Sequence, residues 1–325
     1  MSEIANRMKL FWLFYGLAVL IVLCVMLVGF VLFPAQATSL VGDYVQFNKS
    51  HNLYGNLYAL ILFSLQNPLA WLIILFAIAP TISAVVISLI KGGSRGLLEL
   101  LSRFKLWREG VSAKKGARIY LVLFTVYFAY SGLFLAITAF WGKPGEITQS
   151  LHVLGGGFIP IVTTLFIGAF IDEGGTLEEL GWRGFGLPIL IDRLRNPLRA
   201  TILLAFLWWG WHLPREIPAI IRGGLTTRYI EGQVIFLVLC LSLSVVITFF
   251  YNKTGGSVWP AILIHGGTNV VSKSISGPVN RLVGFDLRTL ILFLMAMFII
   301  IWAGPRLGRR SSYKVIVTKP KVFPA

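Results

Sequence analysis

Two adjacent glutamates and an arginine stand in an otherwise apolar part of the sequence. Glu178, Glu179 and Arg183 follow the uncharged run 158–171, in a chain with 13 acidic residues in total. Ionisable groups inside or beside a hydrocarbon layer are costly, and they are usually found where they serve a function. The alternative is that both glutamates cap a helix end in water. The cluster is therefore a candidate site for acid–base chemistry.

The spacing gives the two glutamates different roles. If residues 177–182 are helical, Glu179 and Arg183 lie four apart on one face and can form an ion pair. Glu178 is rotated by roughly 100° from Glu179 on a 3.6-residue turn, so it points away from the arginine. We expect Glu179 to be a structural anchor. Glu178, unpaired in apolar surroundings, is the candidate general base.

Two histidines in apolar runs supply further groups. His212 follows Trp208 by four residues, and Asn269 follows His265 by four, so each pair shares one helix face. A carboxylate with an imidazole can deprotonate a water molecule. An imidazole with a carboxamide can stabilise the oxyanion that forms when this water attacks a carbonyl. The sequence thus contains the groups of a hydrolytic site.

Two other interpretations of the histidines remain open. In the first, an intramembrane histidine has a purely structural role and forms a hydrogen bond between helices. Alternatively, Glu178, His212 and His265 could hold zinc, with water in the fourth position. The chain lacks the His-Glu-x-x-His helix that would favour zinc. We therefore expect no cofactor and keep zinc as the alternative. His51 and His152 fall in outer loops and are expected to be incidental.

The composition predicts a membrane protein. The chain has 325 residues, of which 56% are hydrophobic and 13% charged, and its mean hydropathy is +0.79. These values exclude an ordinary soluble domain and predict one all-α integral membrane domain over residues 1–325. The basic residues that give the chain its net charge of +16 lie in short loops between apolar runs. This placement is typical of a membrane protein, so we expect no nucleic-acid partner. Cys24 and Cys240 lie in apolar runs and are expected to be packing residues.

Apolar runs predict about eight transmembrane helices. The first run is longer than a signal-peptide core, and we expect it to be retained as an anchor. The short apolar segment 53–65 is expected to be an interfacial or re-entrant helix. The predicted spans are 10–33, 68–90, 119–141, 156–180, 198–213, 233–251, 257–272 and 287–304.

The distribution of basic residues predicts the topology. With the N-terminus inside, 21 of the 29 lysines and arginines fall in five inner segments. These segments are 1–9, 91–118, 183–199, 252–256 and 305–325. The asymmetry predicts a multi-pass plasma-membrane protein with both termini cytoplasmic. Within the loop 91–118, residues 96–108 have the pattern of an amphipathic helix on an anionic leaflet, and the basic tail 305–325 is expected to anchor the same side.

Three ordered motifs in residues 170–272 resemble those of a known family. They are Glu-Glu-x-x-x-Arg, aromatic-x-x-x-His and His-x-x-x-Asn. This set is similar to that of the CPBP (Abi) family of intramembrane proteases, which includes the Ras-converting type of CAAX prenyl endopeptidase. The resemblance implies an eight-helix membrane fold whose catalytic helices surround a conical cavity open to the cytosol.

The resemblance also implies roles for individual residues. The implied catalytic set is Glu178, His212, His265 and Asn269. Structural support would come from Glu179, Arg183 and Trp208. The glutamate and the first histidine would activate water, while the second histidine and the amide would form the oxyanion site. Trp208 stands where phenylalanine is usual in the family, and we expect this change to alter cavity shape more than chemistry.

The leading functional hypothesis is an intramembrane endopeptidase that cleaves a membrane-associated or prenylated protein or peptide. The first alternative is a non-catalytic membrane scaffold, such as a bacteriocin-immunity protein. A scaffold has no need of an unpaired intramembrane Glu178. A transporter with a proton relay is a further alternative, and the lack of repeats with matching broken helices disfavours it. The last alternative is a zinc-dependent protease, in which Glu178, His212 and His265 would hold the metal.

Overall fold

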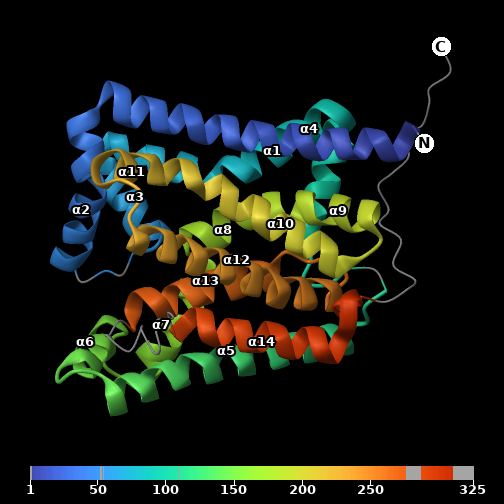
Figure 1. The fold of residues 1–325 in the computed structure, drawn as a ribbon. Coiled ribbons are helices and arrows are strands. Elements are labelled where there is room, and N and C mark those ends of the chain that lie inside the picture. Colours follow the sequence, from blue (N-terminus) through green and yellow to red (C-terminus); the bar gives the residue numbers. More distant parts are fainter. Residues whose placement is uncertain (1, 52, 54, 109, 276–286, 310–325) are drawn as a thin grey trace.

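The computed structural model describes residues 2–51, 53, 55–108, 110–275 and 287–309, which form a bundle of helices (Figure 1). No strand occurs within these ranges. Figure 1 shows α1 and α5 at opposite edges of the bundle, with α10, α12 and α13 between them. The α-helices are α1 Ser2–Leu27, α2 Pro34–Ser50, α3 Leu57–Gln66, α4 Trp71–Leu101, α5 Ala113–Trp141, α6 Glu146–Val153, α7 Phe158–Phe170, α8 Glu173–Glu179, α9 Leu187–Leu194, α10 Pro197–His212, α11 Ile217–Gly223, α12 Thr227–Lys253, α13 Trp259–Ser274 and α14 Leu287–Ala303.

Among the described residues, six helical stretches are long and apolar enough to cross a membrane. They are Arg7–Leu32, Pro68–Phe104, Ala113–Trp141, Phe158–Leu194, Thr227–Lys253 and Leu287–Arg306. The prediction of an all-α polytopic membrane protein is therefore confirmed. The short apolar segment 53–65 coincides with α3, a helix of 10 residues.

The remaining two predicted spans are helices, but they are short. Helices α10 and α13 have 16 residues each, whereas a helix perpendicular to a bilayer needs about 20 residues to cross it. They carry His212 and His265. The count of eight crossings stays a prediction, because these two helices do not reach that length.

The predicted span 156–180 is broken in the structure. Helix α7 ends at Phe170, and α8 begins at Glu173 and leads into a π-helical turn, Leu180–Gly186, before α9. The break has a local cause, since the Asp172 carboxylate accepts a hydrogen bond from Gly175 N at 2.8 Å and caps α8. This break places the two glutamates on a separate short helix.

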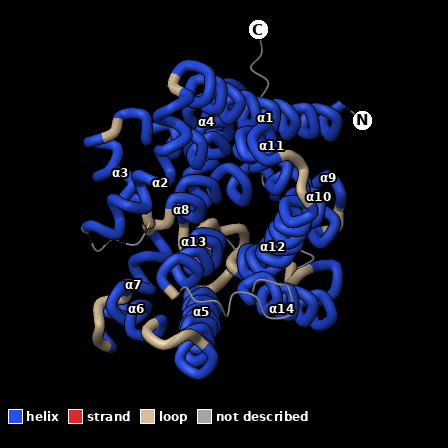
Figure 2. The backbone as a smooth tube through the Cα atoms, turned by 60° about the vertical axis from the view of Figure 1, so that its left-hand side comes forward, coloured by secondary structure: helices blue, strands red, loops and turns tan. Residues whose placement is uncertain are grey.

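Helix α13 lies inside the bundle, where it packs against α5, α7, α8 and α12 (Figure 2). Its crossing with α8 is a close backbone approach. A Cβ atom added to Gly175 would lie 2.6 Å from Gly266 N, so only glycine fits there. Gly175 therefore allows the helix that carries the glutamates to touch the helix that carries His265.

The five segments predicted to share one side of the membrane meet at one end of the bundle. Their contacts are Arg7 Nη1 with Asp192 Oδ2 (2.8 Å), Arg108 N with Thr254 O (3.0 Å) and Asn252 Nδ2 with Leu307 O (3.0 Å). Residues 310–325 of the basic tail lie outside the described part of the chain. This common end agrees with the predicted topology, while the leaflet it faces stays a prediction.

The amphipathic helix predicted over 96–108 is shorter than expected. Helix α4 continues past a non-helical residue, Gly93, and ends at Leu101, followed by a 3₁₀ turn over Ser102–Phe104. Arg103 in this turn points into the protein instead of toward a lipid surface: it is 5% exposed and donates from Nη1 to the Tyr251 hydroxyl at 3.2 Å.

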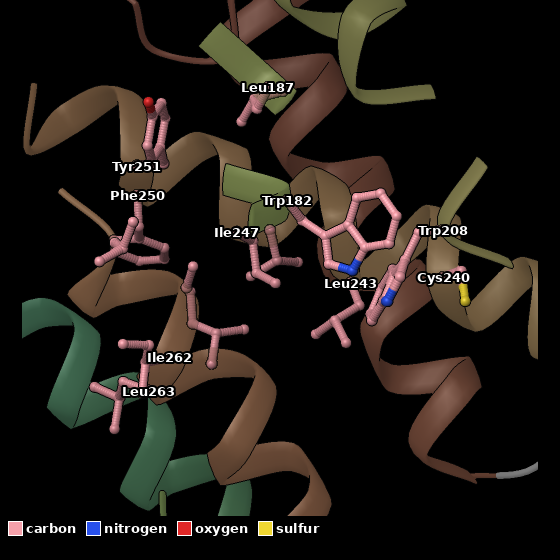
Figure 3. Packing of buried hydrophobic residues seen from close by; sticks show 14 of the residues in the cluster. Trp182, Leu187, Trp208, Cys240, Leu243, Ile247, Phe250, Tyr251, Ile262 and Leu263 are labelled. Carbon is pink, nitrogen blue, oxygen red and sulfur yellow. The ribbon is translucent and has the colours of Figure 1, made fainter. Parts of the chain in front are cut away.

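A tryptophan-rich core lies beside the glutamates. The Trp182 ring packs edge-on against Trp211, with 5.6 Å between their centroids. Figure 3 shows Trp182 and Trp208 among the side chains of α12, with Leu243 and Cys240 labelled. Cys240 is buried, as expected of a packing residue, whereas Cys24 is exposed on α1, so the prediction of a packing role was wrong for Cys24.

Candidate active site

The predicted ion pair between Glu179 and Arg183 is present. Nη1 of the arginine donates to Oε1 of the glutamate at 2.7 Å, and neither side chain has exposed surface. Nη2 donates to the hydroxyl of Ser244 on α12 at 2.9 Å. The pair therefore fastens the π-helical turn to α12. Ser244 is a partner that the sequence did not indicate.

Glu179 has a second contact that the sequence did not predict. Its Oε1 also lies 2.8 Å from Nδ1 of His265. An ionised carboxylate only accepts hydrogen bonds, so Nδ1 carries the hydrogen in this contact. Glu179 thus holds the His265 ring in one orientation as well as pairing with the arginine.

The other glutamate, Glu178, is bound by an indole. Trp208 Nε1 donates to Glu178 Oε2 at 2.7 Å, and the Arg183 guanidinium lies over the indole ring, 4.5 Å from its centroid. Among the described residues Glu178 forms no ion pair, as predicted. This contact was not predicted, since phenylalanine, the usual residue of the family here, has no N–H to donate; the prediction that Trp208 alters cavity shape more than chemistry stays a prediction.

His212 is oriented by its own helix. Its Nδ1 lies 2.9 Å from the backbone oxygen of Trp208, and a carbonyl oxygen can only accept a hydrogen bond. The neutral ring therefore carries its hydrogen on Nδ1, and Nε2 keeps a free lone pair. The indole of Trp208 packs edge-on against both imidazoles, with its centroid 5.8 Å from that of His212 and 5.1 Å from that of His265.

Asn269 is held by a buried aspartate. Its Nδ2 donates to Asp172 Oδ2 at 2.9 Å, and Lys273 Nζ donates to Asp172 Oδ1 at 2.9 Å and to Glu173 Oε1 at 2.7 Å. Lys273 was not predicted as a site residue. Its spacing was a usable signal, because Lys273 follows Asn269 by four residues, just as Asn269 follows His265.

Gly174 on α8 lies close to the side chains of His265 and Asn269. A Cβ atom on this glycine would lie 3.0 Å from His265 Nε2 and 3.3 Å from Asn269 Nδ2. These two nitrogen atoms therefore converge on the same backbone position of α8. Because the Asn269 amide has two hydrogens and gives one to Asp172, the other is left for a further acceptor.

Three of the four predicted catalytic residues contact Trp208: Glu178, His212 and His265. These three residues are buried, but each keeps a small exposed surface: 5% for Glu178, 6% for His212 and 5% for His265. His51 instead bonds to the Phe47 backbone oxygen in α2, apart from this group. Within the described ranges, no group of three or more His, Cys, Asp or Glu side chains has the arrangement of a metal site. The conical cavity over the site stays a prediction.

Comparison with known proteins supports the resemblance seen in the motifs. Residues 149–271 match the family model of the type II CAAX prenyl endopeptidase Rce1-like proteins. The chain is also 28% identical over 146 residues to a protein of Methanococcus maripaludis named CAAX prenyl protease 2. That alignment covers 45% of this chain and spans half the length of the relative.

All seven residues of the three motifs lie inside the matched segment 149–271. The first 148 residues, which include α1 to α5, lie outside it. The resemblance predicted from the motifs is confirmed over residues 149–271, which are similar to the type II CAAX prenyl endopeptidases, a family of proteases.

Proposed function

We propose that this protein is an intramembrane endopeptidase of the CAAX-protease type. Its substrate would be a membrane-associated or prenylated protein, cut at a peptide bond close to the bilayer surface. The observation that carries the proposal is the state of Glu178, an unpaired carboxylate in the protein interior. One of its oxygens accepts from Trp208, and no described residue donates to the other. That second oxygen is suited to accept a proton from water.

In the proposed reaction, Glu178 Oε1 takes a proton from a water molecule that also bonds to Nε2 of His212. The resulting hydroxide attacks the carbonyl carbon of the scissile peptide bond. The tetrahedral intermediate then breaks its C–N bond, and the proton on Glu178 passes to the leaving amine. A positioned general base typically contributes about 10²- to 10⁴-fold in rate.

The oxyanion of the intermediate would lie beside Gly174, close to His265 Nε2 and Asn269 Nδ2. The free N–H of Asn269 can donate to it directly. His265 can donate from Nε2 only when both ring nitrogens carry hydrogen, and the Glu179 carboxylate at Nδ1 supplies the counter-charge for that imidazolium. Removing one such donor typically lowers kcat by about 10²- to 10³-fold.

We also propose that the reaction needs no metal and that the end of the bundle where the five basic segments meet faces the cytoplasm. The charge asymmetry supports this orientation. Cysteine introduced near Lys114 should then be labelled only from the cytoplasmic side. Labelling of the same position from outside intact cells would reverse the topology.

Two assays test the proposed activity. Purified protein should cleave a farnesylated carboxyl-terminal peptide, with the unprenylated peptide as the matched substrate control. In cells, carboxyl-terminal peptides of membrane proteins should differ between wild type and Glu178→Gln. The absence of both differences, with the variant folded, would favour the non-catalytic scaffold.

A further inference from the structure

Asp172 lies at the break between α7 and α8, and its side chain has no exposed surface. None of the catalytic roles proposed above uses it. Its Oδ2 atom accepts two hydrogen bonds, from Gly175 N at 2.8 Å and from Asn269 Nδ2 at 2.9 Å. The first bond caps the helix that carries Glu178, and the second holds the amide of the proposed oxyanion site. One carboxylate oxygen thus joins the two halves of the proposed site.

The backbone around Asp172 is fixed by contacts that replace those of a continuous helix. The Phe170 carbonyl accepts from the Thr176 hydroxyl at 2.7 Å. The Ile171 carbonyl accepts from the backbone N–H of Leu57, the first residue of α3, at 2.7 Å. Backbone groups inside a protein need such partners. The aspartate therefore projects from a backbone whose polar groups are satisfied, and this gives its carboxylate a fixed position.

A lysine balances the charge of this buried carboxylate. Lys273 Nζ donates to Asp172 Oδ1 at 2.9 Å, while its own side chain is 31% exposed. A buried charge is costly unless it is paired and hydrogen-bonded. Because the ammonium binds Oδ1, the other oxygen, Oδ2, faces Gly175 and Asn269. The carboxylate is therefore held in one orientation by its three donors.

The Asn269 amide is held at both ends. Its Nδ2 donates one hydrogen to Asp172, and its Oδ1 accepts from Arg288 Nη1 at 3.5 Å. An amide turned by half a rotation would present its oxygen to the carboxylate, and two acceptors form no hydrogen bond. Asp172 therefore decides which end of the amide faces it, and the second N–H is left for another acceptor.

We infer that Asp172 is a positioning residue of the protease, an inference that rests on the proposed function. It acts through Asn269 and not on the substrate. It orients the second N–H of this amide toward the oxyanion and fixes the amide relative to the helix that carries Glu178. Lys273 supplies the counter-charge that keeps Oδ2 directed at the amide.

Variants of two adjacent acidic residues test the inference by kinetics. Asp172→Ser keeps a residue type that caps helices well, but its side chain is one atom shorter and withdraws the acceptor from Asn269. Its kcat should fall by about tenfold or more at an unchanged KM, since removal of a whole oxyanion donor typically costs about 10²- to 10³-fold. The matched control Glu173→Gln removes an equal charge and the other ion pair of Lys273, but it leaves the bond between Asp172 and Asn269 in place. It should keep the wild-type kcat.

A double-mutant cycle separates positioning from a general loss of structure. In an Asn269→Ala background, Asp172→Ser should change kcat by less than about twofold, because the residue through which it acts is gone. Losses that multiply in the double variant would show that the aspartate acts on the fold, and they would overturn the inference. A wild-type kcat in Asp172→Ser would overturn it as well, while an inactive Glu178→Gln would leave the proposed function standing.

A second measurement needs no activity. In the full chain labelled with ¹⁵N-asparagine in detergent, the two amide hydrogens of Asn269 give a pair of NMR signals, assigned by their loss in Asn269→Ala. We expect both signals to shift in Asp172→Ser and to stay in place in Glu173→Gln. If Asp172→Ser does not fold, Lys273→Met releases Oδ1 and should shift the same signals. Unshifted signals in the measured variant overturn the inference, whether or not the wild type cleaves the farnesylated peptide. A wild type that cleaves nothing but shows the expected shifts contradicts the proposed function and leaves Asp172 as the residue that orients the amide.

Discussion

The indole N–H of Trp208 donates to Oε2 of Glu178 at 2.7 Å, from a residue 30 positions further along the chain. This bond fixes the direction of a carboxylate that has no ion pair among the described residues. The same indole lies under the Arg183 guanidinium and beside both imidazoles. Trp208 is therefore the residue around which the candidate site is arranged.

Trp208→Phe should lower kcat by roughly tenfold with little change in KM. The variant keeps an aromatic ring against both histidines but removes the hydrogen bond that orients Glu178. A hydrogen bond to a charged group contributes about 1.5–3 kcal/mol, which is why a loss of this size is expected. The matched control is Trp209→Phe, because Trp209 Nε1 is buried and has no hydrogen-bond partner among the residues that the structure describes. Steady-state kinetics on both variants checks this, and an equal effect of the two substitutions would contradict the role of the indole.

Glu179→Gln should lower both stability and activity. It leaves Arg183 buried without its counter-charge, and stranding one partner of a buried pair costs about 3–5 kcal/mol. It also removes the charged acceptor that orients His265, so activity should fall even under conditions where the variant remains folded. Melting temperature and turnover measured in one detergent check this. A variant that melts as wild type does would show that the ion pair is not an anchor.

Gly174→Ala should impair catalysis while leaving the fold intact. The added methyl group would press on His265 Nε2 and Asn269 Nδ2, where we place the oxyanion. The gain in helix propensity from Gly to Ala, about 1 kcal/mol, offsets part of this crowding. We expect kcat to fall at least about tenfold at a nearly unchanged Tm. The control is Gly132→Ala in α5, where an added Cβ would meet no described atom within 4 Å. Full activity of Gly174→Ala would show that the oxyanion does not lie beside Gly174.

Exhaustive chelation should leave activity in detergent unchanged. The proposed mechanism uses Glu178 and His212 on water, and it uses His265 and Asn269 on the oxyanion, so no step requires a metal ligand. The check is turnover before and after dialysis against chelator. Recovery of lost activity with one equivalent of zinc would establish the metal-dependent alternative.

Contacts within one helix could be predicted from the sequence, because helical geometry fixes which residues share a face. The Glu179–Arg183 pair is of this kind. The contacts of His265 with Glu179 and of Asn269 with Asp172 join residues 86 and 97 positions apart. They depend on how α8 and α13 cross, and residue spacing does not specify a crossing.

The break between α7 and α8 could not be predicted from hydropathy. The run 156–180 is apolar enough to count as one span, but a single capping carboxylate at Asp172 ends one helix and starts the next. The predicted spans 198–213 and 257–272 match α10 and α13 in length, at 16 residues each. Whether these two short helices cross the membrane stays a prediction.

The central claim is that Glu178 is the general base, and turnover by Glu178→Gln tests it most directly. The amide keeps the shape of the side chain and an oxygen that can accept from Trp208, so the variant should match wild type in Tm and in binding of the farnesylated peptide. Its kcat should be lower by about 10²-fold or more, because an amide cannot take a proton from water. A folded Glu178→Gln protein that cleaves the peptide at the wild-type rate would contradict the account.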